Sequence, residues 1–416
     1  MKNGVVIVGA GHAGVQAAAS LREEGYDGPV ILIGDENEPP YHKPPLSKTF
    51  IKDADAKPQP LRGEAFYSGN AIDYRPGVWI DRIDGELRLG VSGGGTIAFD
   101  RLVLATGSRP RLLKLDGAEL AGVMSLRSLA DARLIRELSA QSEEVVILGG
   151  GFIGLEIAAT LRAAGRGVTV VEALDRLLGR AVAPAIAAHV RQRLEAMGVR
   201  LLTGTTVARL EGEGGRVSAA ITSSGERLPA QLVIIGIGVV PNVELAEAAG
   251  IAIANGIRVD QHMQSSIPEI LAVGDAASYR HWFTGGDVRL ESVQNATDQA
   301  RLAARTIVGH AEPFAAVPWF WSDIGDMKLQ MVGLTQGGDS HVVLGEPAEN
   351  RFSIYHYAGN RLLGIESVNR PADHMLGRKM LGAGFSPAPH TVAAGPDALK
   401  AALAAFSQDE PARASA

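Results

Sequence analysis

The sequence has no cysteine among its 416 residues. Structural disulfides, thiolate metal sites, iron–sulfur clusters ligated by the protein and a redox-active dithiol are therefore excluded. We expect no metal in the functional site. Any electrons that this chain handles must pass through a bound organic group.

Basic charge and long apolar runs are also scarce. The net charge of −6 argues against a dedicated nucleic-acid binder. The most apolar segment, 145–161, contains three consecutive glycines and Glu156, which indicates a strand and a helix rather than a membrane span. No basic leader precedes the first buried strand, which begins near Gly4. We expect a cytoplasmic protein that binds neither nucleic acid nor membrane.

One glycine-rich pattern stands near the start of the chain. "GVVIVGAGHAG" predicts a strand and a turn, and an amphipathic helix and the strand "PVILIGDE" follow as a βαβ unit. Gly9, Gly11 and Gly14 provide the tight turn, the close approach to a pyrophosphate and the helix packing of a dinucleotide site. Asp35, 21 residues after Gly14, is spaced to accept hydrogen bonds from ribose hydroxyls.

The pattern recurs in "VVILGGGFIGLE", with Gly149, Gly151 and Gly154. Glu172 ends the next strand, 18 residues after Gly154, where a carboxylate accepts from the 2′-hydroxyl of NAD and repels the 2′-phosphate of NADP. We therefore expect NADH as the preferred nucleotide, although Arg176 and Arg180 lie nearby.

Two fingerprints in one chain predict two dinucleotides, because a flavin that takes a hydride from a nicotinamide needs a phosphate site of its own. The alternative is a duplication without two ligands. Farther along, the apolar runs 101–110 and 270–277 predict buried strands that end in turns, and 184–197 predicts a helix. After the junction at 313–318, the pattern becomes alternating strands with helices near the end.

The motifs resemble a known family. "GAGHAG", "PPLSK", "LVLATGSRP", "GGGFIGLE", "GIGVVPN" and "AVGDAA" follow in order the motifs of glutathione-reductase-type flavoproteins. "PPYHKPPLSK", "ESVQNATDQAR" and "PWFWSD" more narrowly resemble the ferredoxin reductases of bacterial oxygenase systems, of the putidaredoxin-reductase and biphenyl-dioxygenase-reductase type.

The resemblance implies an α/β fold with two Rossmann-like domains and a C-terminal α+β domain. The FAD-binding domain would comprise residues 1–110 and 240–314, the NAD-binding domain 111–239, and the C-terminal domain 315–416.

The resemblance also implies site residues. Beside the first three glycines, the FAD-contacting positions would be Ala13, Asp35, Lys48, Val78, Arg127, Asp275 and Val293. Beside the second three glycines and Glu172, the NAD-contacting positions would be Ile153 and Gly238.

Three side chains are expected at the reaction centre. Glu156 lies in an otherwise apolar helix, where an unpaired carboxylate is costly, so a pair with Lys48 would relieve both charges near the site of hydride transfer. The other interpretation of Glu156 is a partly exposed first-turn acid. Trp319 and Trp321 alternate on a predicted strand and so share one face. The resemblance favours Trp321 near the flavin.

These patterns lead us to expect an NADH-dependent, FAD-containing reductase of a 2Fe-2S ferredoxin that feeds a haem-thiolate monooxygenase or a Rieske dioxygenase. The alternatives are a rubredoxin reductase, an NADH oxidase, and an NADH-sensing flavoprotein that acts by binding partners. Ferredoxins of this kind are usually acidic, so basic residues are expected to dock them. The candidates are Arg301, Arg305, Lys328, Arg378 and Lys379.

Overall fold

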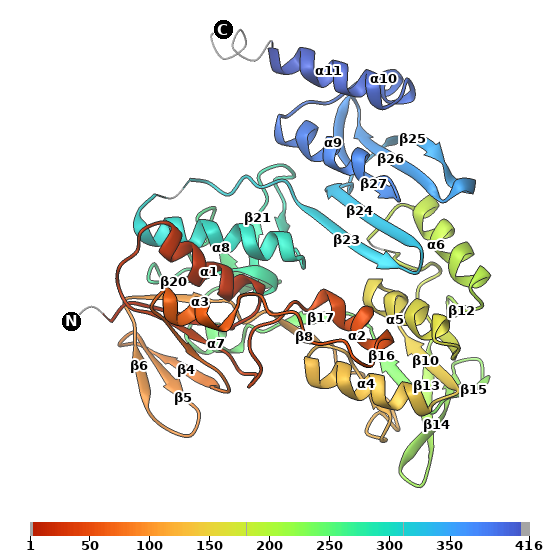
Figure 1. Ribbon diagram of the computed structural model, residues 1–416, viewed down its shortest axis with the longest axis horizontal. Helices are drawn as coiled ribbons and strands as arrows, with labels where there is room; N and C mark the ends of the chain where they lie inside the picture. Colours follow the sequence, from red (N-terminus) through yellow and green to blue (C-terminus); the bar gives the residue numbers. More distant parts are fainter. Residues whose placement is uncertain (1–2, 180, 311, 409–416) are drawn as a thin grey trace. The chain divides into compact units, whose positions relative to one another are not determined.

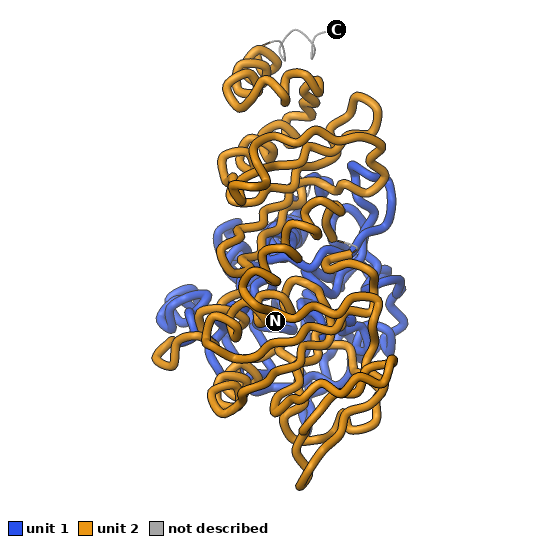
Figure 2. Tube along the Cα trace, turned by 90° about the vertical axis from the view of Figure 1, so that its right-hand side faces the viewer, with its two compact units in different colours: residues 1–43, 57–109, 239–316 blue, residues 44–56, 110–238, 317–416 orange. Residues whose placement is uncertain are grey.

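The computed structural model describes residues 3–179, 181–310 and 312–408 (Figure 1). The chain forms two compact units that interleave along the sequence (Figure 2). Unit 1 comprises residues 1–43, 57–109 and 239–316, and unit 2 comprises residues 44–56, 110–238 and 317–416.

Unit 1 is built around a five-stranded parallel sheet of order β20-β7-β1-β2-β3. Its strands are short runs of buried aliphatic residues, as expected for strands covered on both faces. They are β1 (Val5–Val8), β2 (Val30–Ile33), β3 (Ile72–Arg75), β7 (Arg101–Leu104) and β20 (Ile270–Ala272). Helices α1 (His12–Glu23) and α8 (Val293–Val308) pack against each other through small residues that include Ala13 and Ala296 (Figure 1).

Smaller elements complete unit 1. One antiparallel sheet contains β4 (Ile80–Asp84), β5 (Arg88–Val91) and β6 (Thr96–Ala98). A four-stranded sheet contains β18 (Ile253–Ala254), β19 (Gly256–Val259), β21 (Ala277–Arg280) and β22 (Asp287–Val288). The short helices are α3 (Glu64–Gly69), α7 (Glu244–Ala248) and the 3-10 turn η2 (Gly274–Ala276).

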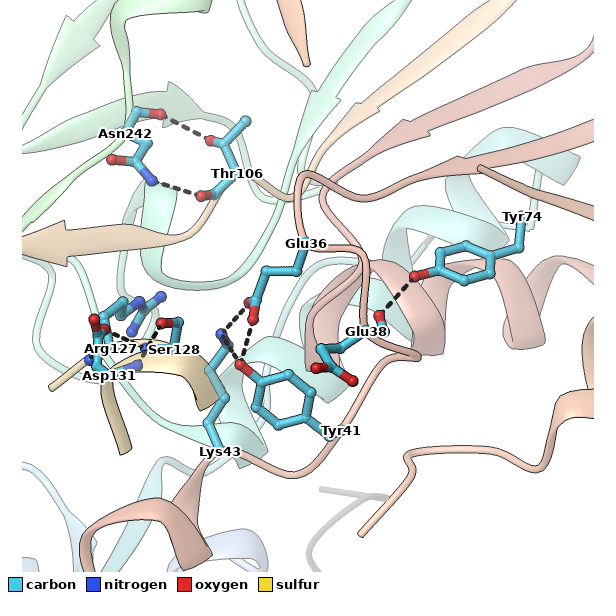
Figure 3. Close-up of polar contacts among 10 residues, drawn as sticks. All are labelled: Glu36, Glu38, Tyr41, Lys43, Tyr74, Thr106, Arg127, Ser128, Asp131 and Asn242. Atoms are coloured by element: carbon cyan, nitrogen blue, oxygen red, sulfur yellow. Dashed lines mark hydrogen bonds and ion pairs between the residues drawn. The ribbon is translucent and has the colours of Figure 1, made fainter. Parts of the chain in front are cut away.

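The strand expected within 101–110 ends in a glycine turn, as predicted, but it is shorter than the apolar run, because β7 stops at Leu104. After β7 the chain turns at Gly107, which has a φ of +67°, and a separate strand β8 (Ser108–Pro110) pairs with β17 (Val239–Pro241). Thr106 and Asn242 fix this turn, because the Thr106 hydroxyl donates to the Asn242 carbonyl and the Asn242 amide donates to the Thr106 carbonyl, both at 2.8 Å (Figure 3).

Unit 2 contains a second five-stranded parallel sheet, of order β12-β11-β10-β16-β9. Its strands are β9 (Val123–Met124), β10 (Glu144–Leu148), β11 (Gly167–Val171), β12 (Arg200–Leu202) and β16 (Leu232–Ile235). Its helices are α4 (Leu129–Gln141), α5 (Phe152–Ala163) and α6 (Pro184–Ala196). A three-stranded sheet contains β13 (Val207–Glu213), β14 (Arg216–Thr222) and β15 (Arg227–Pro229).

The C-terminal part of unit 2 is an antiparallel sheet of order β23-β24-β27-β26-β25, packed on helix α9 (Pro371–Gly382). The strands are β23 (Trp319–Ile324), β24 (Met327–Gly333), β25 (Ser340–Glu346), β26 (Arg351–Ala358) and β27 (Arg361–Val368). The 3-10 turn η3 (Pro347–Glu349) and helices α10 (Pro389–Ala393) and α11 (Pro396–Gln408) complete this part.

Unit 2 also contains a segment from early in the sequence. The 3-10 turn η1 (Pro44–Ser47) and helix α2 (Thr49–Lys52) pack against α4 and α5. The Arg136 guanidinium lies 4.6 Å from the centroid of the Phe50 ring and donates to the Asp53 carbonyl at 3.2 Å. This packing brings the "PPLSK" motif to the helix that carries Glu156.

Candidate active site

The first glycine turn joins β1 to α1, as predicted. Gly14 packs so closely on the turn that a Cβ there would lie 1.8 Å from the Gly9 carbonyl oxygen. At Gly11, by contrast, a Cβ would meet nothing within 4 Å. The turn is therefore tight against its own strand and open at the helix N-terminus, where the first amides of α1 face outward. This arrangement fits a pyrophosphate.

The end of β2 borders this turn. Val8 pairs with Ile33, so the position after the strand is Gly34, and Asp35 is the exposed residue one step farther. The Val78 amide donates to the Gly34 carbonyl at 2.9 Å, which places Val78 beside the same strand end. The predicted role of Asp35 stays a prediction.

A second acid in this loop has a more defined environment. Glu36 accepts a hydrogen bond from the Tyr41 hydroxyl at 2.6 Å and forms an ion pair with Lys43 Nζ at 3.0 Å (Figure 3). Nearby, the Tyr74 hydroxyl donates to the Glu38 carbonyl at 3.1 Å (Figure 3). Burial, together with Glu36 and Asp35, raises the pKa of Tyr74, so this hydroxyl keeps its proton. The sequence analysis missed this network, for which the only signal was the polar composition of the loop.

Asp275 lies at the carboxyl end of β20, in η2, and accepts a hydrogen bond from the Ser108 hydroxyl at 2.9 Å. Ala13 is close to this turn, since a Cβ at Gly274 would lie 3.1 Å from the Ala13 side chain. Val293 is the first residue of α8, directly after the N-cap Ser292. The structure therefore gathers the predicted residues Ala13 and Asp275 at one place in unit 1.

The second glycine turn joins β10 to α5 and repeats the first geometry. A Cβ at Gly154 would lie 2.4 Å from the Gly149 carbonyl oxygen, whereas one at Gly151 would meet nothing within 4 Å. Ile153 stands exposed on the first turn of α5, and Gly238 is exposed with a φ of +98°. Unit 2 therefore also carries an open turn that fits a pyrophosphate.

Glu172 lies directly after β11, beside this turn. One carboxylate oxygen accepts from the Gly150 amide at 2.6 Å, and the other accepts from the Leu174 amide at 2.7 Å. Arg176 donates instead to the Gly179 carbonyl at 2.6 Å, and Arg180 lies outside the described residues. Glu172 is thus held rigidly where an NAD ribose would be recognised.

Arg127 precedes the N-cap of α4. Its amide and that of Ser128 donate to the Asp131 carboxylate at 2.9 and 2.8 Å, and the Asp131 amide donates back to the Ser128 hydroxyl at 3.2 Å (Figure 3). This capping box fixes the backbone of Arg127 at a helix N-terminus.

Lys48 and Glu156 form the ion pair expected from the sequence, with Lys48 Nζ 2.8 Å from Glu156 Oε1. Lys48 Nζ also donates to the Pro44 carbonyl at 3.2 Å. Glu156 is 6% exposed, so it is not a partly exposed first-turn acid. The role of the pair in hydride transfer stays a prediction.

Trp319 and Trp321 lie on one face of β23, as predicted, with ring centroids 5.5 Å apart. Trp319 also contacts Arg378, whose guanidinium lies 4.6 Å from the ring centroid, and the imidazole of His374 at 5.6 Å. His374 is buried, and desolvation, with Arg378 and Lys328 adding to it, lowers its pKa to about 4.

The docking candidates divide between the units. In unit 1, Arg301 pairs with Asp298 at 2.7 Å and Arg305 pairs with Glu24 at 2.9 Å. In unit 2, Lys328 is exposed on β24, and Arg378 and Lys379 lie on α9. The pairing of the two arginines reduces the positive charge that each presents.

Within residues 3–179, 181–310 and 312–408, no three His, Asp or Glu side chains are arranged to hold a metal ion. Over the same ranges, no helix is long and apolar enough to cross a membrane. Two open glycine turns and a lysine–glutamate pair whose carboxylate is buried define a class of protein, the oxidoreductases that bind two dinucleotides.

Comparison with known proteins gives the family. Residues 3–300 match the family model described as pyridine nucleotide-disulphide oxidoreductase, and residues 319–403 match the reductase C-terminal model. The chain belongs to the pyridine nucleotide-disulphide oxidoreductase family, whose members bind FAD and use NAD(P)H. It is therefore a flavoprotein oxidoreductase, although it lacks the dithiol that the family name implies.

Individual relatives match over nearly their full length. The chain is 42% identical to rhodocoxin reductase of Rhodococcus erythropolis, with 96% of this chain and 94% of the relative covered. It is 41% identical to a rubredoxin-NAD(+) reductase of Pseudomonas putida, with 88% and 96% covered. The crystal structure of the ferredoxin reductase for the CYP199A2 system from Rhodopseudomonas palustris matches with a TM-score of 0.94 and 44% identity, covering 97% of this chain and all of that one.

Proposed function

We propose that the protein is an NADH:ferredoxin oxidoreductase that passes electrons to a 2Fe-2S ferredoxin serving a haem-thiolate monooxygenase or a Rieske dioxygenase. The observation that carries this proposal is that one chain contains two open glycine turns and no cysteine. Without a dithiol, the electrons leave the flavin directly for an acceptor outside the chain. The structural match to a ferredoxin reductase supports a ferredoxin as that acceptor.

Each part of the chain has its own role in this proposal. We assign FAD to residues 1–110 and 240–314, NADH to 111–239, and a C-terminal α+β domain to 315–416. Bound FAD supplies the capacity to accept a hydride and to release two electrons one at a time. The chain supplies the anion sites at the starts of α1 and α5, and Asp275 and Val78 hold the flavin dinucleotide. We place the protein in the cytoplasm, where NADH and such ferredoxins occur.

Glu172 selects the nucleotide in this proposal. Both of its oxygens accept hydrogen bonds from backbone amides, which fix the position of the carboxylate. Ile153 and Gly238 border the same strand ends. Ribose hydroxyls donate to such a carboxylate, whereas a 2′-phosphate is repelled by it.

Lys48 and Glu156 act where the hydride crosses. Glu156 fixes the Lys48 ammonium, and the Pro44 carbonyl takes a second N–H. An ammonium has three donors, so the third is available to a bound group. The positive charge stabilises the negative charge that a hydride brings. Trp321, which lies on β23, marks the side from which we propose that the electrons leave.

A panel of electron acceptors tests the proposal. The FAD-loaded protein is mixed with NADH and, separately, with a 2Fe-2S ferredoxin, a rubredoxin or oxygen alone. Rapid NADH oxidation that depends on the ferredoxin is expected. A rate that depends on rubredoxin would favour the second candidate, which the 41% identity to a rubredoxin reductase supports. Rapid oxidation with oxygen alone indicates an NADH oxidase, and slow oxidation with every acceptor indicates an NADH-sensing protein.

A further inference from the structure

The Glu156 carboxylate receives donors from two segments far apart in the sequence. Besides Lys48, the Ser322 hydroxyl donates to Oε1 at 2.6 Å and the Ser47 hydroxyl donates to Oε2 at 2.5 Å. Ser47 ends η1, and Ser322 lies on β23. All of these residues belong to unit 2. Neither serine has a role in the expected site.

Both serines are buried, at 4% exposure for Ser47 and 0% for Ser322. A buried carboxylate is costly unless its oxygens have donors, and Lys48 reaches only one of the two. The Ser47 hydroxyl supplies the donor for Oε2, the Ser322 hydroxyl adds a second donor to Oε1, and together they restrict rotation of the carboxylate about its last bond. They thereby determine where Glu156 places the Lys48 ammonium.

The same hydrogen bonds tie together two predicted catalytic segments. The Thr160 hydroxyl, one turn after Glu156 on α5, donates to the Ser47 carbonyl at 3.2 Å, so η1 is fixed to α5 twice. On the other side, Ser322 directly follows Trp321, and the Phe320 ring contacts the Phe152 ring at 4.8 Å. The strand with Trp321 is therefore held to the helix with Glu156 by the buried Ser322 hydroxyl together with this aromatic contact.

We propose that Ser47 and Ser322 are positioning residues for hydride transfer, which act through Glu156 to hold the Lys48 ammonium in place. The inference rests on the proposed function of the Lys48–Glu156 pair. It assigns to both hydroxyls an effect on the rate of flavin reduction by NADH and none on the affinity for NADH.

The test measures flavin reduction by NADH without any ferredoxin, in an anaerobic stopped-flow instrument, on FAD-loaded variants. Ser322→Ala and Ser47→Ala are each expected to lower the limiting rate constant by about tenfold, with the NADH dissociation constant unchanged, because each loses one charge-assisted hydrogen bond. Ser322→Thr retains the hydroxyl and is expected to recover most of the rate.

A double-mutant cycle distinguishes an action of the Ser322 hydroxyl through Glu156 from a purely structural role of this hydroxyl. If the hydroxyl acts through Glu156, Ser322→Ala lowers the rate of a Glu156→Ala protein, which has no side-chain acceptor at this position, by less than about twofold. The matched control is Ser353, another buried serine of unit 2, which donates to the buried Asp373 carboxylate at 2.8 Å. Ser353→Ala is expected to keep the wild-type limiting rate.

A second readout does not depend on turnover. The thermal midpoint of the FAD-loaded protein is measured over the same cycle. The decrease caused by Ser322→Ala is expected to shrink in the Glu156→Ala background, whereas the decrease caused by Ser353→Ala is expected to be the same in both. If Ser322→Ala does not fold, the limiting rate and the thermal midpoint are both measured on Ser47→Ala instead.

Wild-type limiting rates in Ser47→Ala and Ser322→Ala, or fully additive effects with Glu156→Ala, would overturn the proposal. Failure to reduce any ferredoxin would overturn the proposed function instead. The two failures are distinguishable because the serine measurements need only NADH and the flavin.

Discussion

At the scale of single residues, the second dinucleotide site depends on the position of one carboxylate. Glu172 is fixed by the amides of Gly150 and Leu174, so its charge lies beside the open turn. Its spacing from Gly154 is visible in the sequence, but the two amide contacts are not, because they depend on how the turn folds back over the strand end.

Glu172→Ser should narrow the preference for NADH over NADPH by about tenfold, because the carboxylate that repels a 2′-phosphate is removed. The ratio of kcat/KM for the two nucleotides checks this, and Glu213→Ser, at an exposed acid on β13, is the control. Equal kcat/KM for NADH and NADPH in the wild-type protein would show that Glu172 does not select the nucleotide.

His374 gives the protein a pH-dependent stability. Burial lowers its pKa to about 4 in the folded protein, below the unfolded value of about 6.5. The folded state thus prefers the neutral imidazole, so its stabilisation is complete above about pH 6.5 and is lost as the pH falls toward 4. His374→Gln should therefore show a smaller decrease in the free energy of unfolding between pH 7 and 4.5 than wild type. Unfolding in urea at both pH values tests it, with the exposed His390→Gln as control. Equal decreases in wild type and His374→Gln would contradict the prediction.

At the scale of elements, each site is a strand, a turn and a helix, and the glycine spacing together with the flanking strand and helix patterns predicted both. The local pattern reveals these turns because all of their residues lie within one short stretch. The acid after β2 was harder to assign. By strand pairing, Gly34 is the residue after β2 that corresponds to Glu172 after β11, and Asp35 lies one residue farther along. This correspondence cannot be read from the sequence without knowing where the strands end.

Two of the three glycines of the first fingerprint, Gly11 and Gly14, should respond differently to a side chain. Gly11→Val is expected to fold normally but to lose FAD affinity by more than tenfold, because its side chain enters the open space at the turn. Gly14→Ala is expected to lower the thermal midpoint, because its Cβ would overlap the Gly9 carbonyl. Bound flavin absorbance and thermal unfolding measure the two effects.

The control for this pair is Gly69→Ala, where a Cβ also meets nothing within 4 Å but lies at the end of α3. Gly69→Ala should retain both FAD and stability. Normal FAD content in Gly11→Val would show that this turn does not hold the pyrophosphate.

At the scale of the whole molecule, the sequence predicted the order of motifs and the Lys48–Glu156 pair, but not the serine contacts around this pair. The "PPLSK" segment lies early in the chain, yet it belongs to unit 2 and brings Ser47 and Lys48 to Glu156. Ser322 reaches the same carboxylate from 166 residues away. Such contacts have no local pattern, since side chains so distant in sequence meet only through the tertiary fold.

Docking of an acidic ferredoxin should depend on salt. The KM for ferredoxin is expected to rise severalfold between low and moderate ionic strength, while flavin reduction by NADH stays unchanged. Arg301→Glu should raise this KM severalfold, because it turns a paired charge into a repulsive one. Arg227→Glu, at another exposed arginine that pairs with an acid, is the control. A KM that does not change with salt would leave apolar contacts around Trp321 as the docking surface.

The most direct test of the account is a count of electrons through the protein. NADH is added anaerobically, in amounts below the flavin content, to FAD-loaded protein mixed with excess 2Fe-2S ferredoxin, and the loss of ferredoxin absorbance is recorded. Each NADH carries two electrons, so two ferredoxins should be reduced per NADH, with the flavin oxidised again at the end. Reduced flavin that persists beside fully oxidised ferredoxin would contradict the account, because electrons would enter from NADH without an exit to this partner.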